Sequence, residues 1–125
     1  MALQAIYEWQ MSGNEVYQII AQFMDEQKKK VDIEYFSQLV NGVTGHAEEL
    51  DELYQPHLAN RGVEKIDQVD RAILRIACYE LKNRKDVSYR IVLNEAIELA
   101  KAYASSDSHK FVNGVLDKVA KQLGA

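Results

Sequence analysis

Apolar residues recur every three or four positions along most of this chain, and this helical spacing constrains the fold more than any other feature. In the clearest case the spacing runs without interruption from Ile33 to His57, through Phe36, Val40, Val43, Ala47, Leu50 and Tyr54. Side chains three and four positions apart lie on the same face of an α-helix. The pattern therefore predicts one long helix, which Pro56 bends or stops near its end.

Shorter amphipathic segments flank this helix, and the strand-like alternation of apolar and polar residues is scarce. Asp67 and Ser88 are suitable residues to begin two of these segments. Segments this short are unstable alone in water, so they must pack on one another. We predict an all-α fold, a single compact domain over residues 1–125 with six or seven helices joined by short loops. The apolar residues of the flanking segments lie within 3–10, 16–24, 69–81, 92–103 and 112–123.

The composition fits a soluble domain that can bury a core. Of its 125 residues, 47% are hydrophobic and 27% are charged, and no apolar run approaches the roughly 20 residues that cross a bilayer. The first residues, MALQAIYEWQ, lack the basic and apolar parts of a secretion signal, which predicts a cytoplasmic location without membrane association. Cys78 lies among apolar residues, so we expect a buried and inert thiol rather than a reactive one.

The net charge of −4 is unfavourable for a protein that binds nucleic acid through phosphate neutralisation alone. A local patch or a partner would have to supply positive charge. The dense run Lys28-Lys29-Lys30 lies between two helical segments, where solvated cations near a helix end explain it better than a functional patch does.

The sequence motifs of catalysis and metal binding are absent. The chain has no HExxH motif, no glycine-rich phosphate loop and no nucleophile elbow, and one cysteine cannot form a thiolate zinc cluster. His46 and Glu49 lie three positions apart, but a solvated pair explains them better than a metal site. We therefore expect no catalytic residues, no bound metal and no cofactor.

The segment DSHKFVNGVLDK, from Asp107 to Lys118, departs from ordinary helix composition. Asp107 and Ser108 are a signal for the start of a helix, and Lys110 and Phe111 occupy its first turn, although a cation there opposes the helix dipole. Free backbone N–H groups, a positive charge and a stacking surface together suit a phosphate and an unstacked base of single-stranded RNA. The alternative, which the spacing favours equally, is that Phe111 is an ordinary core residue.

Asn113 and Gly114 occupy the middle of the same predicted helix. An internal glycine costs about 1 kcal/mol relative to alanine, and asparagine adds a smaller penalty. Tight packing against another helix is the preferred interpretation of Gly114. The alternative is that Gly114 lets the backbone of a partner approach closely while Asn113 hydrogen-bonds across that interface.

These segments together strongly resemble the NusB family of bacterial transcription antitermination factors. The resemblance covers essentially the whole chain in order and spacing, and it implies an all-α fold of two helical halves without enzymatic activity. It also implies pairing with ribosomal protein NusE, binding of single-stranded boxA RNA in ribosomal RNA leader transcripts, and a place in the RNA polymerase antitermination complex. The matching motifs are ALQAIYEWQ at 2–10, DRAILRIACYEL at 70–81, NEAIELAK at 94–101 and KFVNGVLD at 110–117.

The resemblance also implies roles for individual residues. Gln4 and Asp107 would hydrogen-bond to base edges, Lys110 would contact a phosphate, and Phe111 would stack on a base or pack against the groove wall. Asp70 would make a charge contact with NusE. Family members usually carry an arginine-rich segment ahead of the first motif, whereas this sequence opens inside that motif, so we expect weaker RNA affinity or a stronger dependence on the partner.

Two other functions remain as alternatives. One is a helical protein–protein interaction module that binds no RNA, which the acidic charge favours. The other is the NusB-like domain of a ribosomal RNA cytosine methyltransferase, detached from the methyl-donor-binding domain that would follow it. Exposed partner surface would also allow the isolated protein to form a homodimer.

Overall fold

Helices form almost all of the described chain. The computed structural model describes residues 2–25, 30–58 and 65–124, and these ranges contain helices and no strand, which confirms the predicted all-α class. The predicted loop at 60–62 and the side chains of the lysine run at 28–30 lie outside the described residues. The helices are α1 (Ala2–Ser12), α2 (Val16–Asp25), α3 (Lys30–Gly45), α4 (Ala47–Tyr54), the short 3-10 helix η1 (Gln55–His57), α5 (Gln68–Asn83), α6 (Tyr89–Tyr103) and α7 (Ser108–Gln122).

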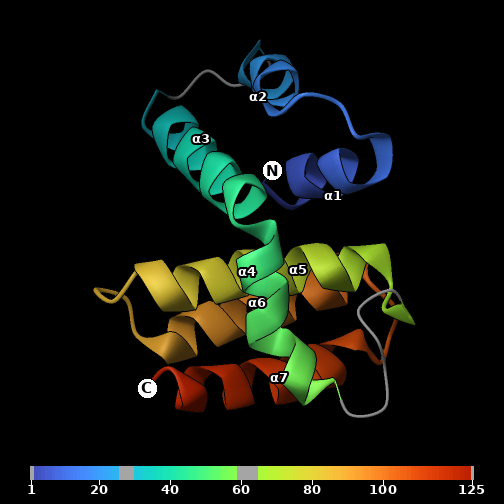
Figure 1. The fold of residues 1–125 in the computed structure, drawn as a ribbon, viewed down its shortest axis with the longest axis vertical. Coiled ribbons are helices and arrows are strands. Elements are labelled where there is room, and N and C mark those ends of the chain that lie inside the picture. Colours follow the sequence, from blue (N-terminus) through green and yellow to red (C-terminus); the bar gives the residue numbers. More distant parts are fainter. Residues whose placement is uncertain (1, 26–29, 59–64, 125) are drawn as a thin grey trace.

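The helices are arranged in two groups (Figure 1). α1, α2 and α3 lie together in the upper part of the view, and α5, α6 and α7 stack in the lower part. α4 crosses the lower group and connects it to α3. This arrangement agrees with the two helical halves that the family resemblance implied.

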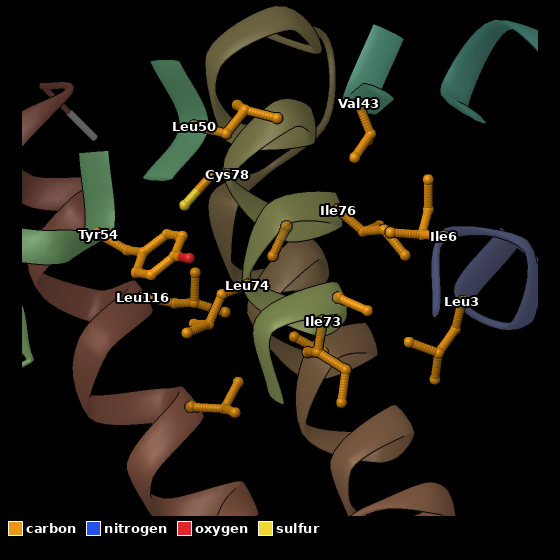
Figure 2. Packing of buried hydrophobic residues seen from close by; sticks show 14 of the residues in the cluster. Leu3, Ile6, Val43, Leu50, Tyr54, Ile73, Leu74, Ile76, Cys78 and Leu116 are labelled. Atoms are coloured by element: carbon orange, nitrogen blue, oxygen red, sulfur yellow. The ribbon is translucent and has the colours of Figure 1, made fainter. Parts of the chain in front are cut away.

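α5 forms the centre of the core. Every residue from 72 to 78 of α5 is buried, because α1, α3, α4, α6 and α7 all pack against this helix. Figure 2 shows Leu3 and Ile6 of α1 beside Ile76 on one side, and Leu50 and Tyr54 of α4 on the other. Complete burial of such side chains contributes about 1.5–3 kcal/mol each. The apolar segment within 69–81 is thus packed against the other helices, as the sequence predicts.

Cys78 is fully buried in this core, as predicted. Burial raises the pKa of its thiol, with a smaller contribution from the negative charge of Asp51. The reactive thiolate is therefore disfavoured.

The long helix predicted from Ile33 to His57 is interrupted. α3 ends at Gly45, and His46 has φ −128° and ψ 24°, outside the helical range, before α4 begins at Ala47. The His46 ring Nδ1 lies 2.9 Å from the Gly42 carbonyl oxygen. The prediction of one continuous helix was wrong, although the apolar stripe itself is correct, because its spacing continues across the break. The buried members of the stripe are Phe36, Val40, Val43, Ala47, Leu50 and Tyr54.

A polar network joins α1 to α4 and α5. The Arg75 guanidinium donates to both carboxylate oxygens of Asp51, at 2.9 and 2.8 Å, and the Tyr54 hydroxyl donates to the same carboxylate at 2.7 Å. Arg75 also donates to the Gln10 side-chain oxygen at 3.1 Å, and the Gln10 amide donates to the Gln68 carbonyl at 2.9 Å. Because Gln68 begins α5, these contacts fix α1 relative to that end of α5.

Candidate nucleic-acid interface

Every residue that the sequence assigned to binding lies on α1, in the first turn of α5, or at the start of α7. Figure 1 shows that α5 and α7 begin, and α6 finishes, on the same side of the lower helix group. α1 lies above this side. The structure therefore brings together residues that are more than 100 positions apart in the sequence.

Gln4 is exposed on α1 and lines a pocket of about 220 Å³. Leu3 and Tyr7 of α1, Val69 of α5 and Tyr103 of α6 line the same pocket. The two tyrosines are 38% and 58% exposed, respectively, so both rings are available to a ligand. Two aromatic rings, two aliphatic side chains and an amide group around one pocket can provide stacking and hydrogen bonding for a planar nucleic-acid base.

The first turn of α7 presents acceptor, cation and aromatic groups close together. The helix begins at Ser108, and the Asp107 carbonyl accepts from the Lys110 amide at 3.2 Å. The exposed Asp107 carboxylate makes no capping hydrogen bond, so it can accept from a ligand. Lys110 is exposed, whereas Phe111 is half-buried and packs against the core. The two interpretations of Phe111 are therefore compatible, because the residue packs against the core and is still partly exposed.

Asp70 joins α5 to the first turn of α7. Its side chain is buried, with the residue 6% exposed, and it accepts a hydrogen bond of 3.2 Å from the Ser108 hydroxyl. The Ser108 hydroxyl lies 2.9 Å from that of Ser105, in the turn before α7. Asp70 thus holds the start of α7 in position. Its neighbour in the sequence, Val69, lines the same pocket as Gln4. A contact between Asp70 and NusE stays a prediction.

Two tyrosines of this surface were missed by sequence reasoning. Tyr7 and Tyr103 fall within the apolar segments 3–10 and 92–103, whose spacing indicates packing and not binding. The structure exposes both. A partial signal was available, since tyrosine carries a polar hydroxyl and is suited to the edge of an apolar face.

The preferred interpretation of Gly114 was also wrong. Gly114 is exposed, and no atom of the described residues lies within 4 Å of the position that a Cβ would occupy, leaving aside its neighbours and the backbone of its own helix. Close packing against another helix of this chain therefore does not explain the glycine. A different glycine, Gly42 of α3, makes that kind of contact, with the ring of Tyr79 on α5.

The described residues contain no group of three or more His, Cys, Asp or Glu side chains placed to hold a metal ion. Among the same residues, no helix is both long and apolar enough to cross a membrane.

The fold and this surface define a helical binding protein whose exposed groups are aromatic, amide and cationic. Comparison with known proteins identifies its family: residues 1–121 match the model of the NusB family, and the chain belongs to that family. The family consists of non-enzymatic antitermination factors, so the chain is not an enzyme.

Individual relatives agree with this assignment. The chain is 54% identical over 125 residues to the transcription antitermination protein NusB of Tolumonas auensis, covering 99% of this chain and 90% of the relative. The NusB structure from T. maritima has a TM-score of 0.92 at 31% identity, covering 99% of this chain and 88% of that one. A crystal structure of the antitermination factors NusB and NusE in complex with double-stranded RNA has a TM-score of 0.88 at 30% identity, covering 97% and 91%.

Proposed function

We propose that this chain is a transcription antitermination factor that pairs with ribosomal protein NusE and, in that heterodimer, binds single-stranded boxA RNA of ribosomal RNA leader transcripts. The observation that carries the proposal is the convergence of the two-tyrosine pocket and the first turn of α7 at one end of the molecule. The names of the relatives and the solved complex of NusB, NusE and RNA support it. The protein would act in the cytoplasm, in the RNA polymerase antitermination complex.

The proposed RNA contacts follow from the chemistry of each side chain. Gln4, at the edge of the pocket, would hydrogen-bond to the base edge of a nucleotide whose ring enters between Tyr7 and Tyr103. Asp107 would accept from a second base, Lys110 would contact a phosphate, and the accessible part of Phe111 would stack on a base or line the groove. Backbone N–H groups of the first turn of α7 already donate to backbone carbonyls, at Ser108, Lys110 and Phe111, so the lysine rather than these amides would attract the phosphate.

NusE would supply positive charge that this chain lacks. The net charge of −4 disfavours strong binding of RNA by this chain alone. Asp70 is the proposed charge contact to NusE, and Asp70→Asn tests it with little change in shape, because the amide oxygen can still accept from Ser108. Weaker NusE binding by a folded Asp70→Asn variant would support this role, and unchanged NusE binding would remove it.

Fluorescence anisotropy with a labelled single-stranded boxA RNA tests the proposal. For the NusE heterodimer, Lys110→Ala should lower RNA affinity and reduce the slope of log affinity against log salt by about 0.7, the effect of one phosphate contact on a single strand. Phe111→Ala should lower affinity with little change in that slope. Neither substitution should weaken NusE binding.

Lys85→Ala is the matched control, because Lys85 is exposed near the opposite end of α5. Identical RNA affinities for Lys110→Ala and Lys85→Ala would contradict the proposal. Unlabelled single-stranded and double-stranded competitors determine which form of RNA the heterodimer prefers. Binding to NusE without any binding to RNA would favour the protein-interaction module instead. A homodimer of the isolated protein stays a prediction, which sedimentation with and without NusE would check.

A further inference from the structure

The middle of α7 carries two residues that weaken a helix and pack against no other part of the described chain. In the part of the chain that the structure describes, no atom lies near the position that a Cβ of Gly114 would occupy. Among the described residues, the Asn113 side chain is exposed and makes no hydrogen bond. Replacing Gly114 by alanine would favour the helix and would meet no other part of the described chain. The described part of the chain therefore does not explain the pair, and a binding partner would.

The surroundings of Gly114 are cationic. Lys110 lies one turn before it and Lys118 one turn after it, both exposed, and they are separated by about 12 Å along the helix axis. Neither lysine has an ion pair among the described residues. The nearby Asp117 carboxylate pairs with Lys121 at 3.0 Å, so its negative charge is balanced locally. The exposed face from Lys110 to Lys118 is thus net positive.

We propose that the phosphate backbone of the bound RNA strand continues from Lys110 along this face of α7, passes close to the helix at Gly114, and reaches Lys118. Glycine suits such a position because it lacks a side chain that would hold another backbone away. The Asn113 amide would donate to the passing phosphate or sugar. This inference rests on the proposed function, because it begins at the RNA contact proposed for Lys110.

RNA explains this face better than a protein segment does. Two unpaired lysines, one on each side of a glycine, match the regular negative charge of a nucleic-acid backbone. The face is also continuous with the proposed RNA contacts in the first turn of α7. A protein segment at Gly114 is the competing outcome, and the experiment distinguishes it by measuring NusE binding separately.

Gly114→Ala provides the test, in the NusE heterodimer with single-stranded boxA RNA. The melting temperature of the chain should rise by about 4 °C, the shift that removal of a glycine penalty gives in a domain of this size. RNA affinity should nevertheless fall roughly tenfold, and NusE affinity should not change. Lys118→Ala should reduce the salt slope by about 0.7.

Gly45→Ala is the matched control, because Gly45 at the end of α3 is also exposed with no atom near its Cβ position. It should leave RNA affinity unchanged. If Gly114→Ala and Lys118→Ala bind RNA like the wild type while Lys110→Ala is weakened, the inference is overturned and the proposed function stands. If Gly114→Ala weakens NusE binding instead, the face binds protein and the inference is also overturned. If the wild-type heterodimer binds no RNA, both proposals fall.

Discussion

Arg75 is a charged residue at the junction of three helices, and its partners determine whether its burial stabilises the fold. Its side chain is 9% exposed, and that of Asp51 is 17% exposed. Burial alone would lower the pKa of Arg75, but the hydrogen bond and negative charge of Asp51 raise it, so the guanidinium stays charged. A buried charge that loses its partner is strongly unfavourable, whereas an exposed ion pair contributes little.

We therefore expect Asp51→Ala to lower the free energy of unfolding by about 3 kcal/mol, because it leaves the Arg75 charge unpaired. Glu49→Ala removes the exposed ion pair with Lys82, at 3.5 Å, and should cost less than about 1 kcal/mol. Urea denaturation of both variants measures the difference. Equal losses would show that the Asp51–Arg75 pair is no more important than a surface pair.

Tyr35 gives the stability a dependence on alkaline pH. Its hydroxyl donates to Glu80 at 2.7 Å, and burial, then this hydrogen bond and the negative charge of Glu80, raise its pKa to about 12. Between pH 10 and 12 the unfolded chain loses the Tyr35 proton while the folded chain keeps it, so stability falls as pH rises. The contribution of Tyr35 is therefore complete below pH 10 and lost as pH rises through about 12.

Tyr35→Phe should consequently be less stable than the wild type at pH 9, and the difference should narrow as pH rises toward 12. Urea denaturation at pH 9, 10.5 and 12 tests this pattern. A constant difference across the three pH values would mean that the hydroxyl does not couple to folding in this way.

At the scale of helices, two aspartates at helix starts have different roles. The Asp67 carboxylate accepts from the Val69 amide at 3.2 Å and caps α5, as its position in the sequence predicts. Asp107 precedes α7 in the same way but makes no side-chain capping bond. An aspartate before the helix thus stabilises the start of α5, whereas the aspartate before α7 has a side chain that is available for binding.

Asp67→Ala should therefore destabilise the protein by about 1 kcal/mol. Asp107→Ala should change stability much less and should weaken RNA binding by the NusE heterodimer. Thermal denaturation and anisotropy measure the two effects. A large loss of stability with unchanged RNA binding for Asp107→Ala would assign that residue to the fold.

Helical spacing of apolar residues predicts which helix faces are buried, but not every feature of the helices. Periodicity predicted the buried stripe through Val40 and Leu50, because burial of one helix face imposes that spacing. It could not detect the break at His46, where the stripe continues through a change in backbone direction. It also could not show that Tyr7 and Tyr103 are exposed, because residues at the edge of a helix face have the same spacing as residues in its centre.

At the scale of the whole molecule, tyrosines lie near both ends of α5, so cross-linking can show which end contacts RNA. Tyr7 and Tyr103 line the pocket at the beginning of α5. Near the other end, Tyr35 lines a pocket of about 330 Å³ that includes Arg84, and Tyr89 lines one of about 230 Å³ with Arg84 and Lys85. Both ends thus offer aromatic groups, but the proposed base contacts lie only at the end of the molecule where α5 begins.

Ultraviolet cross-linking of a boxA strand to the NusE heterodimer, with the cross-linked peptides identified by mass spectrometry, tests this placement directly. The account predicts cross-links in peptides that contain Tyr7, Tyr103 or Phe111. Cross-links confined to peptides with Tyr35 or Tyr89, or to NusE alone, would contradict it.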